Sequence, residues 1–530
     1  MGKVKFSRDK KSLIKATGIE GEYIVPDTVV KIRQDAFADC EGLTSVVVPS
    51  SVKFIGNYAF ADCTSLKSVV ISDSVKEIEE NVFKDCTALN ATIIVNDMLV
   101  LVAKDAAGTF VIPHGVRRIV GGAFRDCNKI TSVEIPDTVT EIVESAFEDC
   151  EELTSIVIPN SVTKIECEAF SNCVNLSSVV IPDSVTEICD LAFNNCMSLT
   201  SVVIPDSVKK IGYCAFGGCS ALASVVIPDS LTEIGDCIFQ GCSELKEPIV
   251  VNDTLVYVPD DFNEYVVPDG VKRIVDAFGY NEDLKTVKLP NTLKEIGDSC
   301  FAYCVSLTSI NIPDSVTKIG LWAFEGCSML TSITIPDSVK SIGAKAFEDC
   351  KNLKSVELPK TVRNIGDCPF FNVTKLKWKE PVIINDMFVY MPKRAKGAYE
   401  IPSNVKRIVG DAFWCCKHLT SITLPDNLEY IGEYAFSGCS KITTLTIPGT
   451  LKKIMHAAFE FCKKLKEIHI QVENPKKIKL DFCAFEDFDV SACTLYVPAE
   501  SVELYRKHRE FKHFKEIIPK RSLEKISSKM

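Results

Sequence analysis

A phenylalanine recurs at a fixed interval along almost the whole chain, and this spacing constrains the fold more than any other feature. Thirteen of the seventeen intervals between successive repeat phenylalanines are 23 residues. A period of that length is typical of a solenoid, in which each repeat contacts only its two neighbours. The chain is therefore predicted to be one array of repeats. The repeat phenylalanines are Phe37, Phe60, Phe83, Phe124, Phe147, Phe170, Phe193, Phe216, Phe239, Phe278, Phe301, Phe324, Phe347, Phe370, Phe413, Phe436, Phe459 and, in a degenerate repeat, Phe485.

Each repeat is predicted to form one coil of the solenoid. Leu199, Val202 and Ile204 follow an L-x-x-L-x-L spacing, which places the three side chains inward from a short parallel strand. Proline, aspartate and serine at 205–207 favour a turn, and a second extended piece leads to the Ala-Phe pair. The predicted fold class is an α/β repeat solenoid: a right-handed leucine-rich-repeat coil of about eighteen turns, with a parallel β-sheet on the concave face and short helical or 3₁₀ turns.

Three of the irregular intervals exceed 23 by 18, 16 and 20 residues. Each excess contains Asn-Asp, an alternating apolar run, a polar turn and a second apolar run, which is typical of a β-hairpin. The N-terminus shows the same pattern, so inserted hairpins are predicted near 12–26, 97–113, 253–268 and 386–402. They divide one continuous solenoid into modules of three, six, five and four coils at 1–91, 92–248, 249–381 and 382–519, the last with a C-terminal cap, and a loose basic tail follows at 520–530.

The repeat unit resembles the BspA-like class of leucine-rich repeats. The resemblance is carried by units of the form Cys-x-x-Leu-Thr-Ser-Val-x-Ile-Pro-Asp-Ser-Val-x-x-Ile-Gly-x-x-Ala-Phe, as at Cys196 to Phe216, and by an end segment that begins Cys493-Thr494-Leu495-Tyr496-Val497-Pro498. It covers about residues 1–518 and implies a surface or secreted protein, a surface antigen of the cell-adhesion type. The N-terminal residues lack the apolar stretch of a signal peptide, so a cytoplasmic location is the alternative.

The 24 cysteines are interpreted as core residues and not as metal ligands. Fifteen of them stand three residues after a repeat phenylalanine, from Cys40 to Cys462. Equivalent side chains in stacked coils run parallel, which is a poor geometry for a disulfide. The C-x-x-C clusters of a metal site are absent from the sequence. We therefore expect reduced, buried thiols, no metal and no other cofactor.

Catalytic residues are not expected, and the chain is predicted not to be an enzyme. The six histidines are scattered, and equivalent positions of other coils do not repeat them: they are His114, His418, His456, His469, His508 and His513. Carboxylate pairs such as Glu79-Glu80 are placed on exposed coil surfaces. The serines of the repeated Thr-Ser-Val triplet recur in strand after strand, which marks them as structural.

A row of valines on the predicted strands is the candidate partner-binding site. Residues at alternate strand positions point outward, and in four consecutive coils this outward position is Val157, Val180, Val203 and Val226. An exposed apolar stripe can mark an interaction surface, although valine also simply suits a strand. A flanking row of hydroxyls would supply polar contacts at the rim: Ser155, Ser178, Ser201 and Ser224.

These features favour a non-catalytic protein-binding repeat protein, adhesin-like and acting on host or neighbouring-cell macromolecules, such as an extracellular-matrix or cell-surface protein. An intracellular scaffold that uses the same solenoid surface is the alternative. The formal net charge of −11 argues against a nucleic-acid partner. The sequence has no apolar run long enough to span a membrane, and we expect a monomer.

Overall fold

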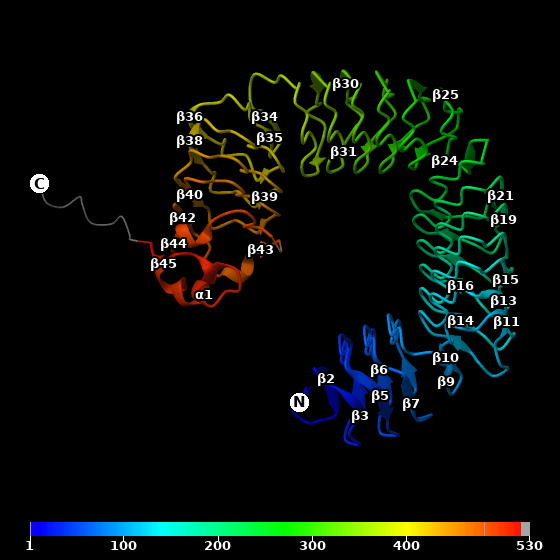
Figure 1. Ribbon diagram of the computed structural model, residues 1–530. Coiled ribbons are helices and arrows are strands. Elements are labelled where there is room, and N and C mark those ends of the chain that lie inside the picture. The colour runs from blue at the N-terminus through cyan, green and yellow to red at the C-terminus, as the bar shows by residue number, and fades with distance from the viewer. Residues whose placement is uncertain (1, 482, 521–530) are drawn as a thin grey trace, which may run out of the picture. The chain divides into compact units, whose positions relative to one another are not determined.

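The computed structural model describes residues 2–481 and 483–520, and the chain divides into two compact units, Met1–Pro259 and Asp260–Met530. Each unit is a parallel-strand solenoid, and together they make about 22 turns. Most coils contribute one strand to a first row and another, usually shorter, strand to a second row, and both rows can be followed in Figure 1. The predicted tail at 520–530 lies outside the described residues except for its first residue, Lys520.

Both rows of strands in the first unit begin near the N-terminus. Its first row contains β3 (Gly21–Ile24), β5 (Leu43–Val48), β7 (Ser68–Ile71), β11 (Gly108–Val111), β13 (Ile130–Glu134), β15 (Ser155–Val157), β17 (Ser178–Val180), β19 (Ser201–Val203) and β21 (Ser224–Val226). Its second row contains β2 (Ser12–Thr17), β4 (Lys31–Ile32), β6 (Phe54–Ile55), β8 (Glu77–Ile78), β10 (Met98–Leu101), β12 (Arg118–Ile119), β14 (Glu141–Ile142), β16 (Lys164–Ile165), β18 (Glu187–Ile188), β20 (Lys210–Ile211) and β22 (Glu233–Ile234).

The second unit repeats this arrangement. Its first row contains β25 (Glu264–Val266), β27 (Thr286–Lys288), β30 (Ser332–Thr334), β32 (Ser355–Glu357), β36 (Gly397–Glu400), β38 (Leu419–Thr423), β40 (Thr444–Ile447), β42 (Glu467–Ile470), β44 (Thr494–Val497) and β45 (Glu516–Pro519). Its second row contains β26 (Arg273–Ile274), β28 (Glu295–Ile296), β29 (Lys318–Ile319), β31 (Ser341–Ile342), β33 (Asn364–Ile365), β35 (Met387–Tyr390), β37 (Arg407–Ile408), β39 (Tyr430–Ile431), β41 (Lys453–Ile454) and β43 (Lys479–Leu480).

Short helices gather at the C-terminal end of the second unit, where the repeat decays. They are η1 (Pro475–Lys477), η2 (Val490–Ala492), η3 (Ala499–Ser501), α1 (Val502–Arg506) and η4 (Phe511–His513). Tyr505 is fully buried, and its hydroxyl donates to the carbonyl of Val472 at 2.8 Å. This segment covers the apolar end that the last coil would otherwise expose, as a terminal repeat requires.

The hairpins are present, but the sequence placed them wrongly. The two runs predicted to pair with each other, Met98–Leu101 (β10) and Gly108–Val111 (β11), lie in different rows. β10 instead pairs antiparallel with the strand before it, β9 (Ile93–Val95). The same local pairing joins β23 (Ile249–Val251) to β24 (Thr254–Tyr257), β34 (Val382–Ile384) to β35, and β1 (Lys3–Phe6) to β2.

The pairing of these strands also corrects the predicted number of solenoid turns, which was about eighteen. After each hairpin the chain runs through a second-row strand and a first-row strand, as β10 and β11 do, so each hairpin region supplies a turn without a repeat phenylalanine. The estimate of eighteen, which counted phenylalanines, omitted these turns. The antiparallel pairs at 93, 249 and 382 lie close to the predicted module boundaries, and the division into four modules stays a prediction.

The asparagine of each Asn-Asp pair has a structural role that explains its recurrence. Asn96, Asn252 and Asn385 adopt positive φ angles of 55°, 56° and 54° at the hairpin turns, a region that asparagine tolerates. Each side-chain amide donates to a backbone carbonyl of the preceding coil, as Asn96 does to Val75 at 2.7 Å. The Asn-Asp pairs are therefore turn residues.

The core is a column of stacked phenylalanine rings. Phe170, Phe193 and Phe216 are fully buried, and their neighbouring ring centroids lie 5.2 and 5.3 Å apart, nearly parallel. Backbone hydrogen bonds also join successive coils next to the rings, because the amide of Phe193 donates to the carbonyl of Ala215 in the next coil at 2.8 Å. A single coil could not bury its ring, so the stack depends on neighbours on both sides.

Candidate functional site

The four valines of the candidate site are exposed. Val157, Val180, Val203 and Val226 keep 61%, 56%, 62% and 54% of their surface accessible. Val157 pairs in register with Val180, and Val203 with Val226. The residues before them in the strands point inward: Ile156 and Val202 are buried, and Val179 and Val225 are partly buried against the core.

The serine row lies beside the valines as the alternation requires. Ser155, Ser178, Ser201 and Ser224 are exposed, and they pair in register within the two strand pairs. The hydroxyl of the preceding residue has a different role, because Ser177 donates to the carbonyl of Thr154 at 3.0 Å. The exposed serines therefore form a polar border along the valines, while their neighbours join successive coils.

The apolar row of the first unit is longer than the sequence analysis proposed. Ile24 and Val70 are 63% and 56% exposed on β3 and β7, and Val111 is 59% exposed on β11. Glu134, on β13 between β11 and β15, interrupts the row with a charge. Strand alternation applied to these apolar runs would have found all three residues, but Ile24 and Val111 had been assigned to predicted hairpins at 12–26 and 97–113.

The equivalent positions of the second unit are mostly polar. Lys288, Thr334 and Glu357 are exposed on β27, β30 and β32, and Asn311 is exposed in the intervening coil. Val266, on the first strand of this unit, is an apolar exception at 65% exposure. Because the same strand position accepts charged side chains here, the valines of the first unit are not required by the fold.

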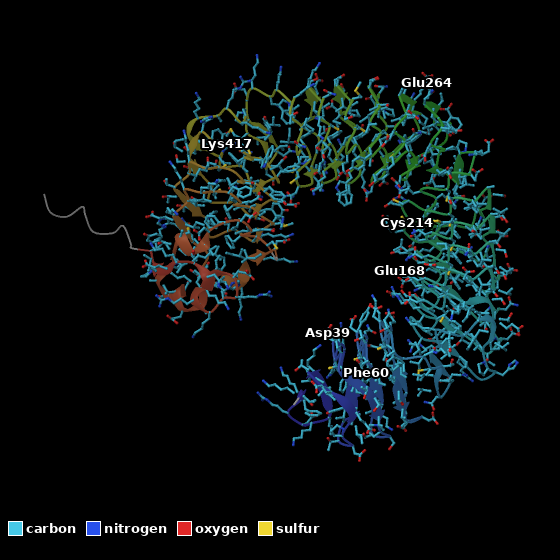
Figure 2. The ribbon with its side chains drawn as sticks, viewed as in Figure 1. Asp39, Phe60, Glu168, Cys214, Glu264 and Lys417 are labelled. Atoms are coloured by element: carbon cyan, nitrogen blue, oxygen red, sulfur yellow. The ribbon has the colours of Figure 1, made fainter. Side chains whose placement is uncertain are left out.

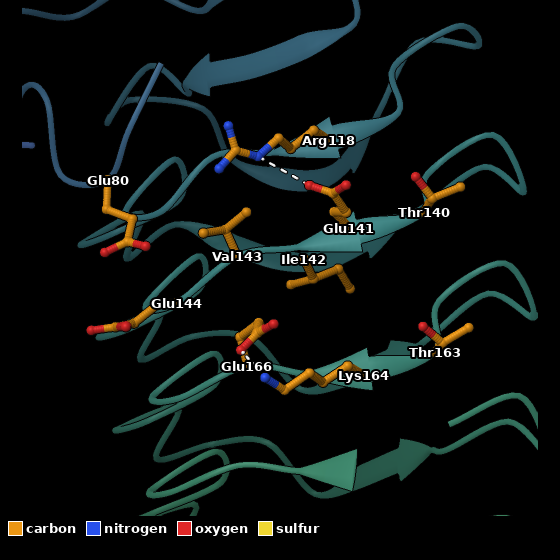
Figure 3. Close-up of a pocket in the computed structure, with 10 residues that line it drawn as sticks. All are labelled: Glu80, Arg118, Thr140, Glu141, Ile142, Val143, Glu144, Thr163, Lys164 and Glu166. Atoms are coloured by element: carbon orange, nitrogen blue, oxygen red, sulfur yellow. Dashed lines mark ion pairs between the residues drawn. The ribbon is translucent and has the colours of Figure 1, made fainter. Parts of the chain in front are cut away.

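A polar cavity of about 470 Å³ lies on the second row of the first unit, between β12, β14 and β16 (Figure 3). Two ion pairs line it: Arg118 Nε lies 3.2 Å from a Glu141 carboxylate oxygen, and Lys164 Nζ lies 3.0 Å from one of Glu166. Glu80 and Glu144 complete the carboxylates that line it.

The two remaining carboxyl groups of this cavity are perturbed. Burial raises the pKa of Glu80, with Arg118 opposing and Glu79 adding to the shift. Burial also raises the pKa of Glu144, and the charge of Glu80 adds to it. Glu80 is therefore half-buried in a cavity and not on a freely exposed surface as the sequence suggested. The side chains that line the cavity form a network of charged groups, and such a lining does not suit an apolar ligand.

The cysteine column has a bonding role that the sequence did not reveal. All fifteen cysteines three residues after a repeat phenylalanine are buried thiols. Most donate to the carbonyl of the phenylalanine one coil earlier, as Cys196 does to Phe170 at 3.3 Å. Burial raises the pKa of Cys127 to about 12. A small side chain with a weak S–H donor satisfies this carbonyl where little space is left. Figure 2 shows the sulfur atoms spaced through the coils.

Three residues that could hold a metal meet in the second unit. His456, Cys483 and Glu486 each offer one ligand atom, and these atoms all lie within 4.8 Å of one another. A search for C-x-x-C spacing could not find this group, because its residues come from two consecutive repeats and stand at different positions in them. His456 stands three residues before Phe459, and Cys483 and Glu486 flank Phe485 in the next repeat.

The helices of the described residues are short. The α-helix α1 has five residues, and none of the helices in the described part of the chain has the length and apolar content that a bilayer crossing requires.

Comparison with known proteins identifies the repeats. A family model described as a BspA type leucine rich repeat region matches residues 19–106, 103–221, 186–261, 251–377 and 384–503. None of the curated proteins matches the chain.

Solved structures of bacterial leucine-rich repeat proteins are similar to the chain. A leucine rich cell surface protein from Faecalibacterium prausnitzii is 30% identical over 71% of this chain and 91% of its own, with a TM-score of 0.40. A leucine-rich repeat protein from Bacteroides ovatus is 27% identical over 78% of this chain and 92% of its own, with a TM-score of 0.33. The chain belongs to the BspA type leucine-rich repeat family.

Proposed function

We propose that the protein is a non-catalytic scaffold that binds another protein through the valine row of its first unit, in the manner of an adhesin at a cell surface. The observation that carries the proposal is the exposure of four valines on consecutive strands, which pair in register two by two, with more than half of each side chain accessible. An exposed apolar row bordered by hydroxyls is typical of an interaction surface. The family membership supports a repeat scaffold of this kind.

The row could contribute a moderate part of the binding free energy. Full burial of a valine contributes roughly 1.5 kcal/mol or more, so covering the accessible part of each one contributes about 1 kcal/mol. Four valines then supply about 4 kcal/mol before the cost of association is subtracted. The serines and the neighbouring exposed residues must supply the rest, which favours an extended partner segment lying across several strands.

A charge placed on the row tests the proposal. Val180→Lys combined with Val203→Lys adds two charges at exposed positions without touching the core. The matched control, Asn311→Lys combined with Thr334→Lys, adds the same charges at equivalent outward positions of the second unit. Both variants should keep the circular dichroism spectrum and melting temperature of the unmodified protein.

Binding is measured on immobilised extracellular-matrix proteins by surface plasmon resonance. We expect at least tenfold weaker binding for the valine variant, which corresponds to about 1.4 kcal/mol, and unchanged binding for the control. Unchanged binding of the valine variant, or equal loss in both variants, would contradict the proposed surface.

An intracellular scaffold is the second candidate, and the thiol column favours it. Fifteen reduced, buried thiols persist best in a reducing compartment. Labelling of intact cells with an antibody against the protein separates the two candidates: signal on unpermeabilised cells supports the adhesin, and signal only after permeabilisation supports the scaffold.

A further inference from the structure

The group formed by His456, Cys483 and Glu486 lies where the regular spacing of the repeat ends. His456 follows β41, and Cys483 and Glu486 follow β43, at nearly equivalent places in consecutive coils. The interval from Phe459 to Phe485 is 26 residues and not 23. The two rings still stack, with centroids 6.0 Å apart, the same distance as between Phe216 and Phe239 at a regular interval.

The backbone holds the two turns against each other. The amide of Ala457 donates to the carbonyl of Cys483 at 2.9 Å, and the amide of Phe461 donates to the carbonyl of Asp487 at 3.2 Å. On the other side, the amide of Tyr434 donates to the carbonyl of His456 at 3.0 Å. The main-chain positions of the three side chains are therefore fixed by coil-to-coil bonds.

The distances suit a tetrahedral metal ion. His456 Nε2 lies 3.2 Å from a carboxylate oxygen of Glu486. Zinc binds nitrogen and oxygen ligands at about 2.0 Å and sulfur at about 2.3 Å, so the ligand atoms of a tetrahedral site lie about 3.3 to 3.8 Å apart. The nitrogen and oxygen already have that separation. The thiol, with all three atoms within 4.8 Å of one another, needs a shift of about 1 Å at most.

We propose that His456, Cys483 and Glu486 bind a divalent transition-metal ion of the zinc type. The set offers imidazole nitrogen, thiolate sulfur and carboxylate oxygen, the three ligand types that zinc uses in proteins. A water molecule completes the tetrahedron. The ion joins the last regular coil to the C-terminal cap, at the seam where the repeat spacing is irregular.

Access and charge agree with this assignment. The side chains of His456 and Glu486 are 30% and 47% exposed, so an ion reaches them from solvent. Asp481 and Glu510 act electrostatically on Cys483, and both add negative charge near the site. A cation at this place lowers the repulsion among these carboxylates.

The competing interpretation is a plain hydrogen-bonded network. His456 Nε2 also lies 3.1 Å from the hydroxyl of Tyr434, so a histidine that only bridges Tyr434 and Glu486 would explain two of the contacts. In that interpretation Cys483 also takes part, because its thiol forms a hydrogen bond with Glu486. Only a bond from the thiolate to the metal ion distinguishes the two interpretations, and metal binding requires Nε2 to exchange the tyrosine contact for the ion.

The experiment titrates chelator-treated full-length protein with Zn²⁺ by calorimetry and with Co²⁺ by absorption spectroscopy. We expect one equivalent of Zn²⁺ and a thiolate-to-cobalt charge-transfer band. Cys483→Ala should remove the band and weaken zinc binding at least tenfold, and His456→Ala should weaken binding to a similar extent. Cys415→Ala, a half-buried cysteine of the same unit away from the group, is the matched control and should change neither result.

A charge-transfer band that survives in Cys483→Ala, or zinc binding of equal strength in that variant, overturns the proposal. If Cys483→Ala does not fold, Glu486→Gln at a half-exposed position gives the same decision, and unchanged zinc affinity in it also overturns the site. The Val180→Lys, Val203→Lys variant should bind Zn²⁺ normally. Failure of the metal site and failure of the valine surface are therefore separate results.

Discussion

Replacing Phe193 by alanine should destabilise the first unit strongly. The ring is fully buried and stacks between Phe170 and Phe216 at 5.2 and 5.3 Å. Truncating a buried phenylalanine costs about 3–5 kcal/mol, of which the two ring contacts account for roughly 0.5–1.5 kcal/mol each. The neighbouring coils are held by backbone bonds, such as Phe170 to Ala192 at 2.8 Å, so the cavity cannot collapse. We therefore expect the upper half of that range.

Urea denaturation followed by far-ultraviolet circular dichroism measures the loss, and hydrogen exchange of residues 170–216 locates it. A solenoid need not unfold in two states, so the local protection of this segment is the decisive measurement. Phe485→Ala is the comparison, because Phe485 is only partly buried and stacks within the column on one side, at 6.0 Å. A loss below about 1 kcal/mol for Phe193→Ala, or an equal loss for both variants, would refute the stacking argument.

Three further predictions follow from the core and the polar cavity. Thiol titration of the native protein should detect few reactive groups and approach 24 in denaturant, because the fifteen cysteines of the column are buried; full reactivity in the native state would contradict this. Glu144→Gln should raise the melting temperature at pH 7 but not at pH 4. Burial raises the pKa of Glu144 in the folded protein, so the charged carboxylate lowers the stability once the pH rises above that pKa, and glutamine removes this loss. A gain that does not depend on pH would exclude this cause. Gly343→Ala should lower the free energy of unfolding by about 1–3 kcal/mol, because an added Cβ would overlap the backbone of Gly320. Gly449→Ala is the control: its Cβ would meet its nearest atom at 3.3 Å, so the loss of stability in the same thermal melts should be clearly smaller.

The sequence by itself determined the coil. The 23-residue spacing places a phenylalanine such as Phe193 at the same point of every turn, and strand alternation separates Ile156 inside from Val157 outside. Both are local patterns, and in a solenoid every neighbour of a coil is the adjacent repeat. Burial in one coil therefore predicts burial in the next, and the exposure of the valine row could be deduced without coordinates.

Only the tertiary structure decided how the irregular segments pair. The run at Met98–Leu101 can form an antiparallel pair with a strand on either side of it, and the alternation of its side chains is the same in both cases. It pairs with Ile93–Val95 because a two-residue turn makes that strand the nearer partner, which leaves Gly108–Val111 to join the next coil.

The contacts between unlike positions also required coordinates. The thiol of Cys196 reaches the carbonyl of Phe170, and His456 meets Cys483 and Glu486, at places that do not correspond by the 23-residue period. The period reports which residues are equivalent, but it does not report which unlike residues face one another. That depends on the direction of each turn and on the 26-residue interval that shifts the last coil, and both are properties of the folded backbone.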